Sequence, residues 1–238
     1  MFSHKGKTRT AKHNLGIASL LSFVAGLVNV VGFFSVQKLT TNVTGHFAYF
    51  VDEAFKQDFR SAFHVALYIF FFFLGAFISN FMVEIYSRRR ENLIYVVPTI
   101  TEAVILAGIG VTGTYLLSKN PDLIAFSLLF AMGMQNSLVT SISNAVVRTT
   151  HLTGLFTDMG IEFSQLFFYK DQKHKKKLIK SIKLRLIIIW LFFAGGVSGG
   201  IFYTHFGIRT LLFGSLILLL GLLYDFVKIR ILLLRRKL

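Results

Sequence analysis

The chain has 238 residues, of which 54% are hydrophobic, and its net charge is +15. Its apolar residues form blocks of roughly 20, the length that crosses a bilayer as a helix, so a soluble fold is excluded. The basic residues lie between these blocks, as in membrane proteins, and no basic stripe with interleaved aromatic residues is present, so nucleic acid is excluded as a partner.

The sequence offers little chemistry for catalysis. It contains no cysteine, which excludes disulfides, thiolate catalysis and cysteine-based metal sites. Zinc-protease and phosphate-loop motifs are also absent from it. We therefore predict no cofactor, no metal and no enzymatic activity.

A basic arm at residues 1–14 precedes the first apolar run, at residues 15–36. This run is too long for the core of a signal peptide, and no small-residue cleavage site follows it. The pattern therefore predicts a first transmembrane helix rather than a cleaved signal.

Six apolar blocks are expected to span the membrane. They lie at about 15–36, 62–84, 93–117, 123–146, 182–204 and 207–228. Two further segments, 40–57 and 149–168, are semi-polar, and each is too short in its apolar part for an ordinary span but suits a half-helix. The predicted fold is thus an all-α polytopic membrane protein with six transmembrane helices plus two half-helices.

The distribution of lysine and arginine predicts the orientation. The rich loops and ends are the arm at 1–14, the 85–92 loop, the 147–181 segment and the tail at 229–238. They alternate with segment 37–61, whose three basic residues are offset by three acidic ones, and with the poor loops at 118–122 and 205–206. By the positive-inside rule both termini are cytoplasmic. The run Lys173–Lys177 either binds anionic lipid of the cytoplasmic leaflet or only fixes the orientation.

A pattern of small and polar residues occurs twice in the chain. The pairs are Gly26 with Gly133, Asn29 with Asn136, Thr41 with Thr150, Thr44 with Thr153, Gly45 with Gly154 and Glu53 with Glu162. These pairs predict a first repeat at 15–117 and a second at 123–228, each with three spans and one half-helix. Because three spans is an odd number, the second repeat is inverted in the membrane, as in many secondary transporters.

A weaker match joins the helices around Gly75 and Gly195, both in small-xxx-small patterns that let helices approach closely. The sequence does not decide whether these Gly-rich faces join helices within one chain or join two copies in a homodimer.

The amides Asn29, Gln135 and Asn136 are expected deep in their spans, roughly 20 Å from the start at 1.5 Å per residue. They either bond across the repeat interface or bind a solute. Thr44 and Thr153 are expected to cap the half-helices, whose N-termini favour an anionic or polar group. The other residues expected at this site are Thr41, Asn42, Gly45, His46, Thr150, His151 and Gly154.

Four carboxylates are candidates for function within or near the membrane. Glu102 lies inside a strong span, where a carboxylate is either functional or paired internally, and as a functional residue it is expected at the solute site. Glu53, Asp158 and Glu162 lie on the half-helices and either couple transport to protons or cations or are simply exposed at the interface.

One motif suggests an enzyme. The segment from Gly196 to Gly199 is similar to the Gly-x-Ser-Gly nucleophile segment of rhomboid intramembrane proteases. A serine nucleophile needs a base within hydrogen-bonding reach, and His205 lies about 10 Å from Ser198 along the predicted helix. An intramembrane serine protease is therefore only a remote alternative.

The paired motifs resemble those of the YoaK-like family of uncharacterised bacterial membrane proteins. The matching segments are Ala25 to Asn29, Asn42 to Gly45, Met132 to Asn136 and Thr149 to Gly154. The resemblance implies a six-span protein of the bacterial inner membrane and no established substrate. Members of that family commonly have aspartate at the position of Asn29 and asparagine at that of His46.

These observations lead to one principal hypothesis and one rival. The hypothesis is a small transporter or channel for a small polar or anionic solute, with its site between the repeats. The rival is a non-transporting scaffold or lipid-binding protein, whose polar residues only satisfy one another.

Overall fold

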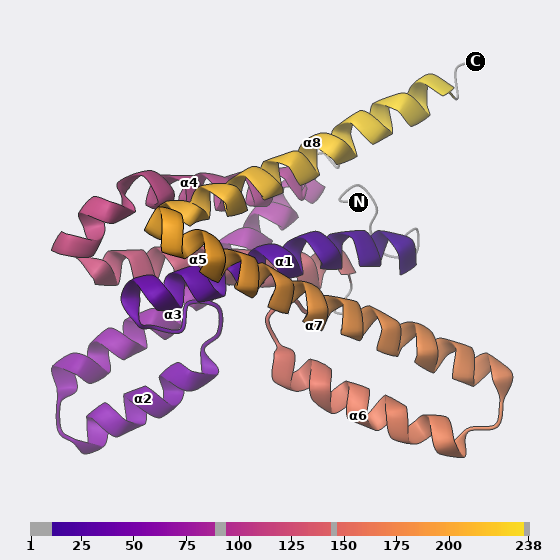
Figure 1. The fold of residues 1–238 in the computed structure, drawn as a ribbon, viewed down its shortest axis with the longest axis horizontal. Helices are drawn as coiled ribbons and strands as arrows, with labels where there is room; N and C mark the ends of the chain where they lie inside the picture. Colours follow the sequence, from indigo (N-terminus) through magenta and orange to yellow (C-terminus); the bar gives the residue numbers. More distant parts are fainter. Residues whose placement is uncertain (1–10, 89–93, 144–146, 236–238) are drawn as a thin grey trace.

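The computed structural model describes residues 11–88, 94–143 and 147–235. Within these ranges the chain forms eight α-helices and one 3-10 turn, without a β-strand, so the predicted all-α class is confirmed (Figure 1). The helices are α1 (Ala11–Val36), α2 (Thr44–Phe55), α3 (Phe59–Ser87), α4 (Val96–Lys119), α5 (Pro121–Ser143), α6 (Leu152–Phe168), α7 (Gln172–Phe206) and α8 (Leu211–Arg235), with the 3-10 turn η3 (Gly207–Thr210) between the last two.

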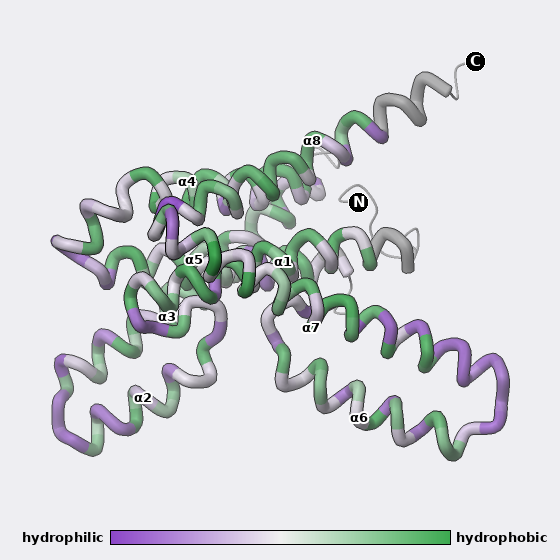
Figure 2. The backbone as a smooth tube through the Cα atoms, in the orientation of Figure 1, coloured by the Kyte–Doolittle hydropathy of each residue, from purple (hydrophilic) through white to green (hydrophobic). Residues whose placement is uncertain are grey.

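Five stretches are long and apolar enough to cross a membrane by length and composition. They are Leu15–Val36, Phe59–Arg88, Val96–Lys119, Pro121–Ser141 and Gln172–Lys228, the last of which includes both α7 and α8. Figure 2 shows apolar residues along these helices, with hydrophilic residues gathered at the α2–α3 and α6–α7 turns. Side chains such as Phe73, Phe77 and Phe81 of α3 are more than half exposed, as expected for a surface in contact with lipid.

The long helix α7 differs from the prediction. It begins at Gln172, ten residues before the predicted span, because Asp171 caps it by accepting hydrogen bonds from the backbone N–H groups of Lys173 and His174. The Lys-rich run is thus the first turns of a helix and not a loop. The predicted basic arm up to residue 10, the residues 89–93 of the loop at 85–92, and residues 236–238 of the tail lie outside the described residues.

Glycines allow two pairs of helices to cross at backbone contact. A side chain at Gly26 of α1 would overlap the carbonyl oxygen of Phe192 in α7, and one at Gly195 of α7 would overlap that of Phe23 in α1. The Gly-rich faces that left a homodimer open are therefore occupied within the chain.

The same arrangement recurs between α3 and α5. There Gly75 faces the carbonyl oxygen of Phe130, and Gly133 faces that of Phe72. The crossings α1–α7 and α3–α5 are the most extensive contacts between helices, and α4 packs against α8 and α5 beside them.

The two short helices lie along the same edge of the molecule (Figure 1). Each begins near the middle of the long dimension, and from there α2 and α6 run toward opposite ends. The helix α2 packs mainly against α3, and α6 against α7. The start of α1, the α6–α7 turn and the end of α8 lie toward one end of the molecule, while the α2–α3, α4–α5 and α7–α8 connections lie toward the other.

Candidate functional site

A cavity of about 280 Å³ lies where the two short helices begin. Both helix starts and the segments that precede them contribute to it, together with one side chain each from α1, α3 and α7. The lining residues are Asn29, Thr41, Asn42, Val43, Thr44, Phe72, Thr150, His151, Leu152, Thr153, Gly154 and Phe192. We call this the central cavity. Most of the predicted site residues therefore meet at one place.

Matched hydrogen bonds hold the segments that line the central cavity. The Thr41 hydroxyl donates to Asn29 Oδ1 at 2.7 Å, and the Thr150 hydroxyl donates to Asn136 Oδ1 at 2.7 Å. Each bond joins the chain before a short helix to the long helix that precedes it.

The predicted caps are wrong. The residues that precede the helices are Val43 for α2 and His151 for α6, and neither helix has a side-chain hydrogen bond at its cap. Thr44 and Thr153 instead lie within the first turns and line the cavity. The free N–H groups of a helix start carry partial positive charge, so two such starts at one cavity favour an anion or an oxygen-rich solute.

The buried amide Gln135 has a structural partner. Its Nε2 donates to the carbonyl oxygen of Leu21 at 2.8 Å and so joins α5 to α1. Gln135, Asn136 and Gly45 are not among the residues that line the central cavity. The Oε1 of Gln135 and the Nδ2 of Asn136 are buried without a hydrogen-bond partner among the described residues.

The two histidines of the paired motifs have different surroundings. His151 lines the central cavity, directly before α6. His46 is almost completely buried in the first turn of α2, where its Nε2 lies 2.6 Å from the carbonyl oxygen of Leu39 and donates to it. Because a carbonyl oxygen can only accept, the His46 ring carries a proton on Nε2 in this contact.

A second cavity, of about 430 Å³, lies between α2, α3 and the start of α5. His46 lines it, as do Tyr68 and Asp122, whose hydroxyl and carboxylate are hydrogen-bonded at 2.5 Å. His64 Nδ1 lies 3.6 Å from the same carboxylate. This cluster was not predicted from the sequence, because Asp122 lies more than 50 residues along the chain from its other members and no motif joins them.

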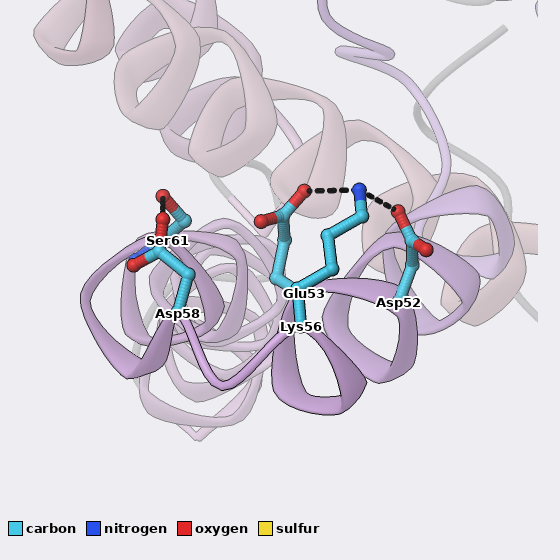
Figure 3. A network of polar contacts seen from close by, with 5 residues as sticks. All are labelled: Asp52, Glu53, Lys56, Asp58 and Ser61. Carbon is cyan, nitrogen blue, oxygen red and sulfur yellow. Dashed lines mark hydrogen bonds and ion pairs between the residues drawn. The ribbon is translucent and has the colours of Figure 1, made fainter.

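Glu53 lines this second cavity and belongs to an exposed cluster at the α2–α3 turn (Figure 3). Lys56 Nζ lies 2.6 Å from Asp52 and 3.4 Å from Glu53, while Asp58 caps α3 through the backbone N–H of Ser61. The structure therefore separates Glu53 from the central cavity.

The carboxylates of α6 share one cation. Arg185 of α7 lies 3.0 Å from Asp158 and 2.6 Å from Glu162, and it also contacts the hydroxyl of Ser181. Sequence analysis missed Arg185 because it lies inside the predicted span at 182–204. A sequence signal was present, since an arginine inside an apolar block needs an acidic partner.

Glu102 stands apart from both cavities. It is fully buried in α4, and neither carboxyl oxygen has a hydrogen-bond partner among the described residues. Ser198 and His205, the pair weighed for a protease, are also separated, because His205 lines a hollow at the α7–α8 turn to which Ser198 does not contribute. No cluster of three metal-binding side chains occurs in the described ranges.

Comparison with known proteins identifies relatives by sequence. Residues 17–224 match the family described as "Protein of unknown function (DUF1275)". The chain is similar to the UPF0700 transmembrane protein YoaK of Bacillus subtilis (strain 168), with 25% identity over 186 residues that cover 76% of this chain and 80% of that protein. No solved structure matches the chain. The resemblance inferred from the paired motifs is thereby confirmed.

Proposed function

The chain belongs to the DUF1275 family, and we propose that it is a transporter or channel of the bacterial inner membrane that passes a small polar or anionic solute through the central cavity. The observation that carries this proposal is the meeting of two helix N-termini at one cavity lined by Thr41, Thr44, Thr150 and Thr153. Helix starts of this kind bind anionic groups in soluble proteins and substrates in transporters.

We propose that the chain is an inverted repeat in which α1 to α4 correspond to α5 to α8. The matched threonine–asparagine bonds, the matched glycine crossings and the opposite directions of α2 and α6 support this relation. In such folds the solute site lies near the membrane midplane, between the repeats. The small cavity volume favours a solute with few non-hydrogen atoms.

We propose that the end of the molecule with the α6–α7 turn is cytoplasmic. The lysines of the run Lys173–Lys177 lie on the first turns of α7 at that end, and both the start of α1 and the end of α8 lie toward it. This agrees with the positive-inside rule. The same lysines would attract anionic lipid by about 1 kcal/mol each near the surface.

A non-transporting scaffold is the second candidate. The hydrogen bonds from Thr41 to Asn29 and from Thr150 to Asn136 favour it, because they satisfy these side chains without a ligand. We propose no enzymatic activity and no resident cofactor or metal.

Cysteine accessibility distinguishes the two candidates, since the chain has no native cysteine to remove. In intact cells and inverted vesicles, a membrane-impermeant thiol reagent is applied to Thr44→Cys and Thr153→Cys, with Lys119→Cys and Lys175→Cys as controls for the two surfaces. Transport predicts that both threonine positions react from both sides while each control reacts from one. Reaction of Thr44→Cys and Thr153→Cys only from their own surfaces would contradict transport and favour the scaffold.

A further inference from the structure

The short helices expose a large apolar surface that no other helix covers. Nine large apolar side chains on α2 and α6 are between 37% and 87% exposed and do not line the second cavity. They are Phe47, Phe50, Val51, Phe55, Phe156, Ile161, Phe163, Phe167 and Phe168. We call this surface the half-helix face. It lies along the lower edge of the molecule in Figure 1, where α2 and α6 are the outermost elements.

Polar groups interrupt the half-helix face near its centre. Thr44, His151 and Thr153 are exposed there, where they also line the central cavity, and the non-helical segments 37–43 and 147–151 adjoin them. If α2 and α6 lie within the bilayer, as the proposed function requires, lipid cannot hydrogen-bond these groups. Non-helical backbone at that depth is tolerated only where protein covers it or water fills a protein-lined cavity. Lipid alone is therefore an unsuitable cover for this face.

The charges on the face are compatible with a second copy of the chain. Asp52 is paired with Lys56, and Asp158 and Glu162 are both paired with Arg185. Two identical faces can therefore approach without bringing unpaired carboxylates together, which would otherwise oppose a symmetric contact.

The size of the face suits a stable dimer. At roughly 200 Å² for an aromatic side chain, the nine exposed apolar residues present on the order of 1,000 Å². A stable interface buries about 800 Å² on each partner.

We propose that the protein is a parallel homodimer in which the half-helix faces of two copies meet. The partner covers α2 and α6 and completes the walls around the polar segments that lead to the central cavity. This proposal rests on the proposed placement of α2 and α6 within the membrane.

Cross-linking in membranes tests the dimer. Phe47→Cys and Phe156→Cys occupy matched positions on α2 and α6, and Val104→Cys on α4 is a control of similar exposure, 62% against 56% and 55%. Purified variants in proteoliposomes, at a low ratio of protein to lipid, are treated with copper phenanthroline and run on gels without reductant. We expect most of the Phe47→Cys and Phe156→Cys protein at the mass of a dimer and the Val104→Cys protein at that of a monomer.

The other outcomes overturn the proposal in distinguishable ways. Equal cross-linking of Val104→Cys would show random collision. If Phe47→Cys were neither cross-linked nor labelled by an impermeant thiol reagent, lipid would cover the half-helix face. The proposed dimer would then be wrong, while the proposed function would stand. Labelling by that reagent without cross-linking would place α2 in water, and the membrane placement on which the proposed function depends would fail as well.

Discussion

Replacing Gly26 with alanine should cost about 3 kcal/mol or more of stability and greatly reduce the yield of folded protein. The added methyl group would overlap the backbone carbonyl of Phe192, and a backbone cannot rotate away as a side chain can. Gly133→Ala, which meets the carbonyl of Phe72 at the other crossing, should have a similar effect. The measurement is the apparent melting temperature in detergent, followed by size-exclusion chromatography.

Gly108→Ala is the matched control, because no atom lies within 4 Å of the added methyl group. It should leave the melting temperature unchanged or raise it slightly, since alanine favours the helix more than glycine does. If Gly26→Ala melted within a degree or two of Gly108→Ala, the close crossing of α1 and α7 would be contradicted.

Replacing Arg185 with alanine should destabilise the attachment of α6 to α7 by about 2 to 4 kcal/mol. The side chains of Arg185 and Glu162 are only 20% and 15% exposed, so removal of the cation leaves a largely buried carboxylate without its partner. Asp158 is half exposed and loses less. Hydrogen exchange over α6 and the apparent melting temperature should both report the loss.

A charge-neutral background provides the control for this prediction. In the variant that combines Asp158→Asn, Glu162→Gln and Arg185→Met, most of the lost stability should return, because no buried charge is left unpaired. The exposed neighbour Lys183→Ala should have little effect. Failure of the triple variant to regain stability would mean that Arg185 acts through packing and not through its charge.

The long helices and the paired motifs could be predicted because local signals specify them. Apolar blocks of membrane-spanning length located the long helices. The motif of Gly26 and Asn29 occurs again as Gly133 and Asn136, and this repetition agrees with the matched glycine crossings and the matched hydrogen bonds. The polar residues around Thr44 and Thr153 were predicted to form one site, and this site includes most of the residues that line the central cavity.

The remaining features depend on contacts between distant residues. The hydrogen bond from Tyr68 to Asp122 forms only because α3 lies against α5, and no spacing of residues in the sequence predicts it. The early start of α7 follows from the cap at Asp171, which makes helix out of a run that charge alone assigned to a loop. Glu102 was expected at the solute site from its depth, but depth does not determine which side of a helix faces a cavity.

The central claim is that the starts of α2 and α6 meet at one cavity, and a cross-link between Thr44→Cys and Thr153→Cys tests it most directly. A short bifunctional thiol reagent is applied to the double variant in membranes, and the monomer band is digested and analysed by mass spectrometry. The control pairs Thr44→Cys with Gly160→Cys, which lies seven residues further along α6, about 10 Å at 1.5 Å per residue. The account predicts an efficient cross-link within one chain for Thr44→Cys with Thr153→Cys and little for the control. Equal yields for the two pairs, or no intramolecular cross-link in either, would contradict it.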